Sequence, residues 1–234
     1  MSLRFTSSLI LASAFALLQP LATQAQSSII GRAEGDQYFS PTTAFNVTIP
    51  VIAELGGTIT DTDNVVSFQD EFTTHQSIAC FKMDATLNRE EETRGRKDYL
   101  IWFFANFVQA DFEQRFAGAR IESAHFIKSI NDGALLTYNL LPGGTMFPAR
   151  ACILNNNNSI IAKRGNLLFV KNGYVFVVSI ELVEKAVEHA AFTMTVAEED
   201  AELRKRLLTF SDKITFTMPP AASTPLKPAA GSAK

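Results

Sequence analysis

The strand predicted over residues 174–182 constrains the fold most, because both of its faces carry apolar side chains. One face has Tyr174, Phe176, Val178, Ile180 and Leu182, and the other has Val175 and Val177 before it turns polar at Ser179 and Glu181. The turn at 171–173 (Lys-Asn-Gly) joins this strand to one at 166–170 as a hairpin. Strands with two apolar faces need cover on both sides. We therefore expect a sheet with a helix on each face.

Further strands belong to the same sheet. Residues 120–130 and 134–141 are predicted to form a second hairpin around the Asn-Asp-Gly turn at 131–133. Strands are also expected over 45–49, 65–69 and 74–83. The highly charged segment 84–96 is predicted to be a surface loop that has room for one helical turn. Residues 142–165 are predicted to be a long loop or a ragged strand.

Two amphipathic helices can cover the sheet. In residues 97–116 the apolar positions fall near a 3.6-residue period, and Gly118 ends the helix. The second helix begins near Thr195, which forms a capping box with Glu198, and it presents Leu203, Leu207, Phe210 and Ile214 on one face. The predicted fold class is α+β, with an antiparallel β-sheet sandwiched between helices.

The first 25 residues have the pattern of a signal peptide. Arg4 precedes a ten-residue apolar run from Leu9 to Leu18, and small residues occupy the positions before a cleavage after Ala25. The run is too short for a stable membrane anchor; the alternative is a buried N-terminal helix. We expect a periplasmic or secreted protein with a single domain over 26–217 and a disordered Pro/Ala-rich tail over 218–234.

The charge balance gives no reason to expect a nucleic-acid partner. The chain has 21 basic and 24 acidic residues, and loss of Arg4 with the signal peptide leaves 20 against 24, a net charge of −4. Nucleic-acid binding domains usually carry a basic surface. No nucleic acid is therefore expected as a partner.

Cys80 and Cys152 are the two cysteines of the chain. In an oxidising compartment an even number of cysteines favours a disulfide. The alternative is a buried Cys80 and a loop thiol at Cys152 that never meet.

No motif points to catalysis or to a metal. The sequence lacks GxSxG, SxxK and HExxH patterns, and His75, His125 and His189 are not at metal-ligand spacing. We therefore predict no catalytic residue, no metal site and no cofactor. An enzyme site assembled from distant residues, such as that of a hydrolase, stays open as an alternative.

The helix at 97–116 carries more aromatic residues than one buried stripe needs. Tyr99, Trp102 and Phe103 spread over a broad arc, which makes them a possible interaction surface or the wall of an apolar ligand pocket. The alternative is a thick core. We expect Phe104 and Phe107 to face the sheet and Trp102 to lie near the opposite, exposed side; in a thick core the helix would instead be buried all round.

The order of the elements resembles that of the PsbP-like family. The resemblance rests on "YFSP…FNVTIP" (38–50), a central helix, two hairpins, "RGNLLFVKNGYVFVVSIEL" (164–182) and a closing helix. The stretches "GRKDYLIWFF" and "GALLTYNLLPGGTMF" are similar to those of bacterial periplasmic proteins. The resemblance implies an exported protein of a mostly non-catalytic family. We therefore expect a non-catalytic accessory module, and a protein is the partner we expect it to bind. The alternatives are a hydrolase with a dispersed site and a carrier of a small apolar ligand.

Overall fold

The computed structural model describes residues 29–70, 74–143, 161–187 and 192–217 of the 234-residue chain. The predicted signal peptide (1–25) and tail (218–234) lie outside the described residues. Within them, a seven-stranded antiparallel sheet has the order β4-β5-β6-β10-β9-β8-β7. Its strands are β4 (Thr58–Asp61), β5 (Val65–Gln69), β6 (His75–Lys82), β7 (Arg120–Ile127), β8 (Ala134–Pro142), β9 (Ile161–Lys171) and β10 (Tyr174–Glu181).

Both predicted hairpins are present. The β9–β10 turn places Asn172 at φ 50° and Gly173 at φ 79°, a left-handed pair that favours Asn-Gly and matches the twist of the strands. The second hairpin pairs β7 with β8. The strand β9 begins at Ile161, within the segment predicted as a long loop or a ragged strand, and its first residue pairs with Pro142 at the end of β8.

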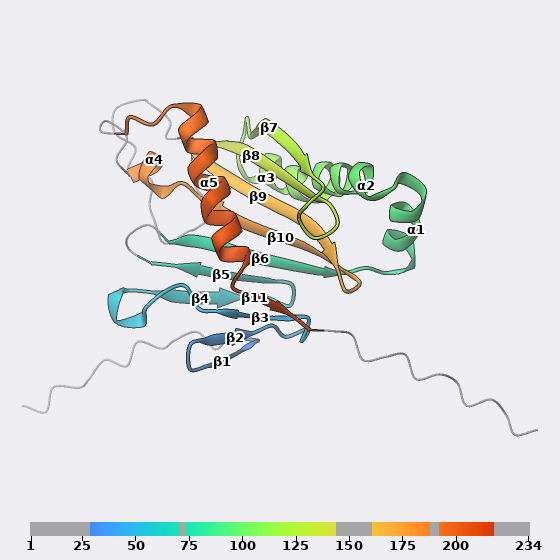
Figure 1. Cartoon of the computed structure of the whole chain (residues 1–234). Coiled ribbons are helices and arrows are strands. Elements are labelled where there is room, and N and C mark those ends of the chain that lie inside the picture. The colour runs from blue at the N-terminus through green and yellow to red at the C-terminus, as the bar shows by residue number, and fades with distance from the viewer. Residues whose placement is uncertain (1–28, 71–73, 144–160, 188–191, 218–234) are drawn as a thin grey trace, which may run out of the picture.

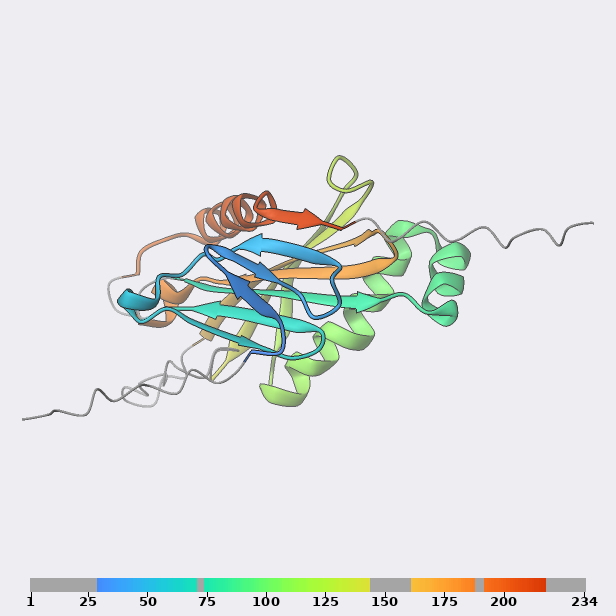
Figure 2. The same ribbon diagram turned by 90° about the horizontal axis from the view of Figure 1, so that it is seen from below.

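Helices cover both faces of the main sheet, which confirms the predicted α+β sandwich (Figure 1). On one face lies α5 (Val196–Ser211), whose N-cap Thr195 and Glu198 form the predicted capping box. The other face is covered by α2 (Arg96–Phe103), the π-helical segment η2 (Phe104–Gln109) and α3 (Ala110–Arg115). Figure 2 shows α5 and the α2–α3 stretch on opposite sides of the strands.

The sheet separates two apolar layers. Leu203, Leu207 and Phe210 of α5 pack on the face that carries Phe169 and Phe176, whereas Tyr99 and Phe103 of α2 are in the layer on the other face. The helix α5 approaches β9 closely at Gly165, where a Cβ atom would lie 2.9 Å from the Leu207 side chain. Glycine is therefore the residue that fits at this position.

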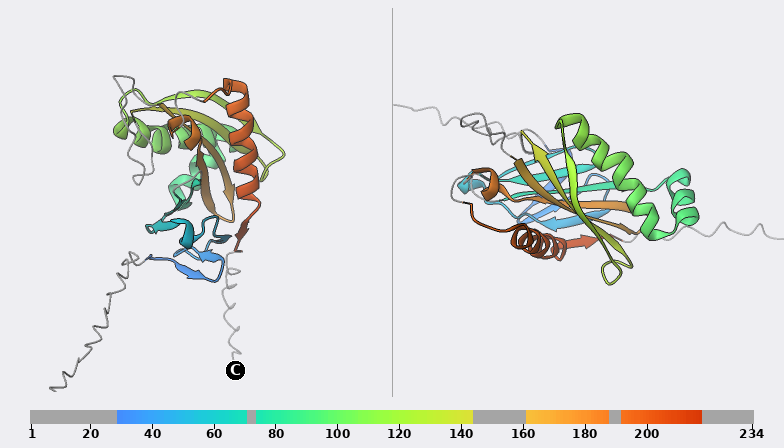
Figure 3. Two further views of the ribbon diagram at one scale, coloured as in Figure 1. Left: turned by 90° about the vertical axis from the view of Figure 1, so that its left-hand side faces the viewer. Right: turned by 90° about the horizontal axis from the view of Figure 1, so that it is seen from above.

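A second, four-stranded sheet extends the α5 side of the molecule. Its strands, in the order β1-β2-β3-β11, are β1 (Arg32–Glu34), β2 (Gln37–Phe39), β3 (Phe45–Thr48) and β11 (Ile214–Phe216). Tyr38, Phe45 and Val47 join the same apolar cluster as α5. Figure 3 shows β11 bringing the C-terminal end of the described chain beside the N-terminal strands. Only β3 was predicted from the sequence, since strands of three residues leave almost no periodic pattern.

The prediction of a loop over residues 84–96 is wrong. Most of this segment forms α1 (Ala85–Arg94), and the Asp84 carboxylate accepts a hydrogen bond of 2.8 Å from the backbone of Leu87 as its N-cap. The helix has no buried residue, so its sequence shows no apolar period. Two short helices complete the elements, a 3₁₀ turn η1 (Ala53–Leu55) and α4 (Val183–Val187). Among the described helices, each is too short or too polar to cross a membrane.

Candidate functional site

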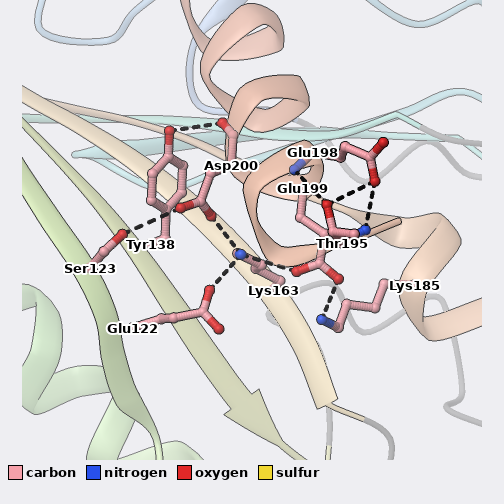
Figure 4. Close-up of polar contacts among 9 residues, drawn as sticks. All are labelled: Glu122, Ser123, Tyr138, Lys163, Lys185, Thr195, Glu198, Glu199 and Asp200. Carbon is pink, nitrogen blue, oxygen red and sulfur yellow. Dashed lines mark hydrogen bonds and ion pairs between the residues drawn. The ribbon is translucent and has the colours of Figure 1, made fainter. Parts of the chain in front are cut away.

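The most unusual side chain in the structure is a lysine that is fully removed from solvent. Lys163 lies near the start of β9 and has an exposed fraction of 0%. Its side chain points toward the first turn of α5, where Glu199 and Asp200 meet it (Figure 4). Glu122 reaches the same ammonium group from β7. A buried charge is stable only when it is paired in this way.

A bulge in β7 aims Glu122 at the lysine. The register of β7 against β8 shifts between Ile121 and Ser123, so that Glu122 has no partner on β8. Because of the bulge, the consecutive residues Glu122 and Ser123 both face α5. The Ser123 hydroxyl donates a hydrogen bond of 3.5 Å to Asp200 Oδ2. Bulges commonly redirect a side chain in this manner.

We call Lys163, Glu122, Glu199, Asp200 and Lys185 the lysine centre. Lys163 Nζ lies 2.5 Å from Glu122 Oε2, 2.5 Å from Asp200 Oδ1 and 3.0 Å from Glu199 Oε2. Lys185 of α4 adds a second cation, with its Nζ 2.5 Å from Glu199 Oε1. The centre therefore joins β7, β9, α4 and α5 through one set of ion pairs.

The surroundings of Lys163 keep it charged. Burial by itself opposes the charge, but the hydrogen bonds that the ammonium group donates to Asp200, Glu122 and Glu199 together raise the pKa of Lys163 above its ordinary value. Burial and the nearby Asp200 likewise raise the pKa of Tyr138 to about 12, so its hydroxyl stays protonated and donates to the Asp200 carbonyl at 2.8 Å. A permanently protonated lysine is a fixed charge and not a nucleophile.

A groove of about 680 Å³ lies beside the lysine centre. It runs between α5 and the β7–β8 hairpin and shares Tyr138 and Asp200 with the centre. Its apolar lining consists of Ile127, Leu136, Tyr138, Ala201 and Leu208. Its charged lining consists of Asp200, Arg204, Lys205 and Asp212, and His125 and Thr209 complete the groove. Because the lysine centre holds the first turn of α5, it fixes one wall of this groove.

The opposite face of the sheet holds a separate buried polar network. Arg164, the neighbour of Lys163, points to the α3 side, where its guanidinium donates to Glu181 Oε1 at 3.2 Å and to Ser77 Oγ at 2.9 Å. Asn166 Oδ1 accepts from Arg164 Nε at 3.3 Å and from Ser179 Oγ at 2.9 Å. The network crosses β6, β10 and β9 and therefore fixes their register.

The network continues into the π-helical segment. Asn166 Nδ2 donates to Asn139 Oδ1 at 3.0 Å, and Asn139 Nδ2 donates to Gln109 Oε1 at 2.7 Å. Gln109 is the last residue of η2 and is buried. A π turn holds one extra residue, and here that residue rotates Gln109 inward to meet Asn139.

The same π turn overturns the expected placement of the aromatic residues. Phe104 is buried as predicted, but Phe107 is 49% exposed, because η2 shifts the inward face from position 107 to Gln109. Tyr99 and Phe103 are buried at 0% and 2%, which corrects their place in the predicted interaction surface. Trp102 is partly buried and packs edge-to-face on Phe107, with 5.6 Å between the ring centroids.

The predicted disulfide cannot be followed in the structure. Cys80 is buried on β6, and burial raises the pKa of its thiol to about 12. Cys152 lies outside the described residues, so the pairing stays a prediction. His125 is exposed on β7, and His75 is buried at the start of β6. Within the described ranges, no group of three His, Cys, Asp or Glu side chains is arranged to hold a metal ion.

The sequence analysis missed the lysine centre. Its one local indication is the pair Lys163-Arg164, two cations in a strand that is otherwise largely apolar. Alternating side-chain direction sends one cation to each face of the sheet. Charged residues at fully covered strand positions need buried partners, and this requirement could have pointed to a polar centre on each side.

No family model matches the sequence, and no curated protein matches it. Among solved structures, the chain is similar to cyanobacterial PsbP (CyanoP) from Synechocystis sp. PCC 6803, with 12% identity over 85% of this chain and 100% of that chain and a TM-score of 0.47. It is also similar to the Ran-binding protein Mog1p of Saccharomyces cerevisiae, with 10% identity over 82% and 97% and a TM-score of 0.44.

Proposed function

We propose that the protein is an exported, non-catalytic accessory module that binds a segment of a partner protein in the groove between α5 and the β7–β8 hairpin. The groove itself is the observation that carries this proposal. Its volume of about 680 Å³ and its mixed apolar and charged lining suit a short peptide segment. The floor comes from rigid strands, and the lysine centre holds the helical wall in place.

The chemistry of the groove favours binding over catalysis. The lysine beside it is protonated and held by three carboxylates. Among the described residues that line it, Thr209 and Tyr138 supply the hydroxyl groups, and the Tyr138 hydroxyl is already used as a donor to the backbone of α5. A nucleophilic site needs a hydroxyl or thiol next to a base.

The charges on the rim of the groove favour an acidic partner segment. Arg204 and Lys205 are exposed there, and Lys205 has one long ion pair with Glu202 at 3.8 Å. Asp200 is paired with the buried Lys163, and Asp212 lies at the C-terminal end of α5. We therefore propose an extended segment that carries acidic side chains next to an apolar one.

Site-specific photo-crosslinking tests the groove. A photoreactive residue placed at Thr209 is expected to capture one partner protein in an envelope extract, because this position lines the groove. The same residue placed at Thr93, which is exposed on α1, is the matched control and should capture nothing. The rim change Arg204→Glu should abolish capture at 209, while Arg89→Glu on α1 should leave it intact. Equal labelling from 209 and 93 would refute the groove as the binding site.

Export is part of the same proposal. Cleavage after Ala25 would make Gln26 the first residue of the mature chain. N-terminal sequencing of protein recovered from the cell envelope should find this start, and a thiol assay on the unfolded, unreduced sample should find no free thiol if Cys80 and Cys152 pair. A chain that still begins at Met1 would contradict export.

A further inference from the structure

The exposed face of α2 and η2 carries an aromatic cluster that the groove does not use. Ile101 is 44% exposed and Phe107 is 49% exposed, and the partly buried Trp102 packs edge-to-face against Phe107. The guanidinium of Arg94 stacks on the indole at 5.2 Å, which holds the ring in one orientation. We call Ile101, Trp102 and Phe107 the aromatic patch. It lies on the opposite side of the sheet from α5 and the lysine centre.

The described chain ends beside the β9–β10 turn, at the end of the sheet where α2 begins. The Thr217 carbonyl accepts a hydrogen bond of 3.0 Å from Asn172 in the β9–β10 turn. Two residues before that turn residue, the Val170 carbonyl accepts a bond of 3.3 Å from Arg96, the first residue of α2. Figure 2 shows β11 running toward the end of the sheet where α1 and α2 lie. The chain that follows Thr217 therefore starts beside the N-terminus of the helix that carries the patch.

The remaining 17 residues have a composition that fits an aromatic surface. Residues 218–234 contain Pro225-Leu226-Lys227-Pro228, a PxxP sequence. Such sequences favour the polyproline II conformation, which docks on exposed aromatic side chains because little conformational entropy is lost. Lys227 can meet Asp98, which is exposed one helical turn before Trp102 on the same face.

The lengths agree with such a contact. Phe107 lies about 16 Å along the helix from Arg96, at 1.5 Å per residue. The PxxP sequence begins eight residues after Thr217, and eight to eleven residues of polyproline II chain span about 25–35 Å. A short flexible connection also gives a tethered segment an effective concentration on the order of mM. At this effective concentration, a weak contact between proline and aromatic side chains is enough to populate the docked state.

We infer that the aromatic patch is a binding site for a proline-rich segment, and that its occupant is the PxxP sequence 225–228 of the same chain. The π turn is essential to this site, because it turns Phe107 outward next to Trp102 while Gln109 enters the core. The site is independent of the groove on the other side of the sheet.

The fluorescence of Trp102, the one tryptophan of the chain, tests the inference directly. In the full mature protein the docked segment should shield the indole from acrylamide. A variant that ends at Thr217 should show red-shifted emission and stronger quenching. Pro225→Ala combined with Pro228→Ala should reproduce that change, whereas Pro219→Ala combined with Pro220→Ala, the matched control, should not. A peptide of residues 218–234 added to the shortened chain should restore shielding in a saturable manner.

Three outcomes would overturn the inference. Identical emission and quenching with and without residues 218–234 would show that the patch is empty. An equal effect of the two double-proline variants would remove the PxxP sequence as the occupant. Shielding that grows with protein concentration would assign the segment to a second copy of the chain. Circular dichroism of each variant separates these outcomes from unfolding, and crosslinking at Thr209 remains a separate test of the groove.

Discussion

Replacing Lys163 with methionine is expected to lower the free energy of unfolding by about 3–5 kcal/mol. The change removes a fully buried ammonium group and leaves Glu122, Glu199 and Asp200 close together, with Lys185 as the remaining cation of the centre. Uncompensated carboxylates in a covered site repel one another and lose their hydration. Urea unfolding followed by circular dichroism measures the loss.

The matched control is Lys205→Met. Lys205 lies on α5 with 76% of its side chain exposed and pairs with Glu202 at 3.8 Å, so its removal should change stability by no more than about 0.5 kcal/mol. If Lys163→Met and Lys205→Met lower the free energy of unfolding by similar amounts, the lysine centre does not hold α5 in place.

The lysine centre also predicts the direction of a pH effect. A lysine whose pKa is raised by folding stabilises the native state fully at pH values below its unfolded pKa of about 10.4. That contribution is lost as the pH rises through the higher native pKa. The wild-type protein should therefore lose stability above about pH 10.4, and this step should be missing from the Lys163→Met variant. The same alkaline loss in both proteins would contradict the assignment.

The second large effect concerns two phenylalanines three residues apart. Phe104→Ala is expected to cost about 3–5 kcal/mol, because the side chain is 2% exposed in the apolar layer under α2. Phe107→Ala should cost no more than about 1.5 kcal/mol, since the ring is 49% exposed and its contacts are with the rings of Trp102 and Phe103. Chemical denaturation of the two variants gives the comparison.

The pair is its own control, because the substitution is the same and the positions share one helix. In an uninterrupted α-helix, residues three apart face the same side, so the two substitutions would lower the free energy of unfolding by similar amounts. The π-helical segment separates them. Equal destabilisation by the two variants would mean that the helix is regular in solution and that Phe107 belongs to the core.

Much of the architecture could be predicted from local sequence. The strand at 174–182 is apolar on both faces, which predicted a helix on each face of the sheet. The helices α2–α3 and α5 lie on those faces. The Asn-Gly turn and the Thr195–Glu198 capping box were predicted correctly as well, since each depends on residues within a few positions of one another. The helix α1 was missed because a helix without a buried residue has no apolar period to detect.

The features that distinguish this protein were decided by tertiary structure. Lys163 meets its three carboxylates only because a bulge in β7 and the first turn of α5 converge on β9. Along the chain, Glu122 lies 41 positions from Lys163 and Glu199 lies 36 positions from it. The π turn likewise depends on Asn139, which is 30 positions from Gln109. Hairpin turns, helix caps and amphipathic faces depend on residues that are close together in the sequence. The pairing of buried charges and amides is set by which strands and helices the whole fold brings together, and so the sequence by itself determined the layers but not the sites within them.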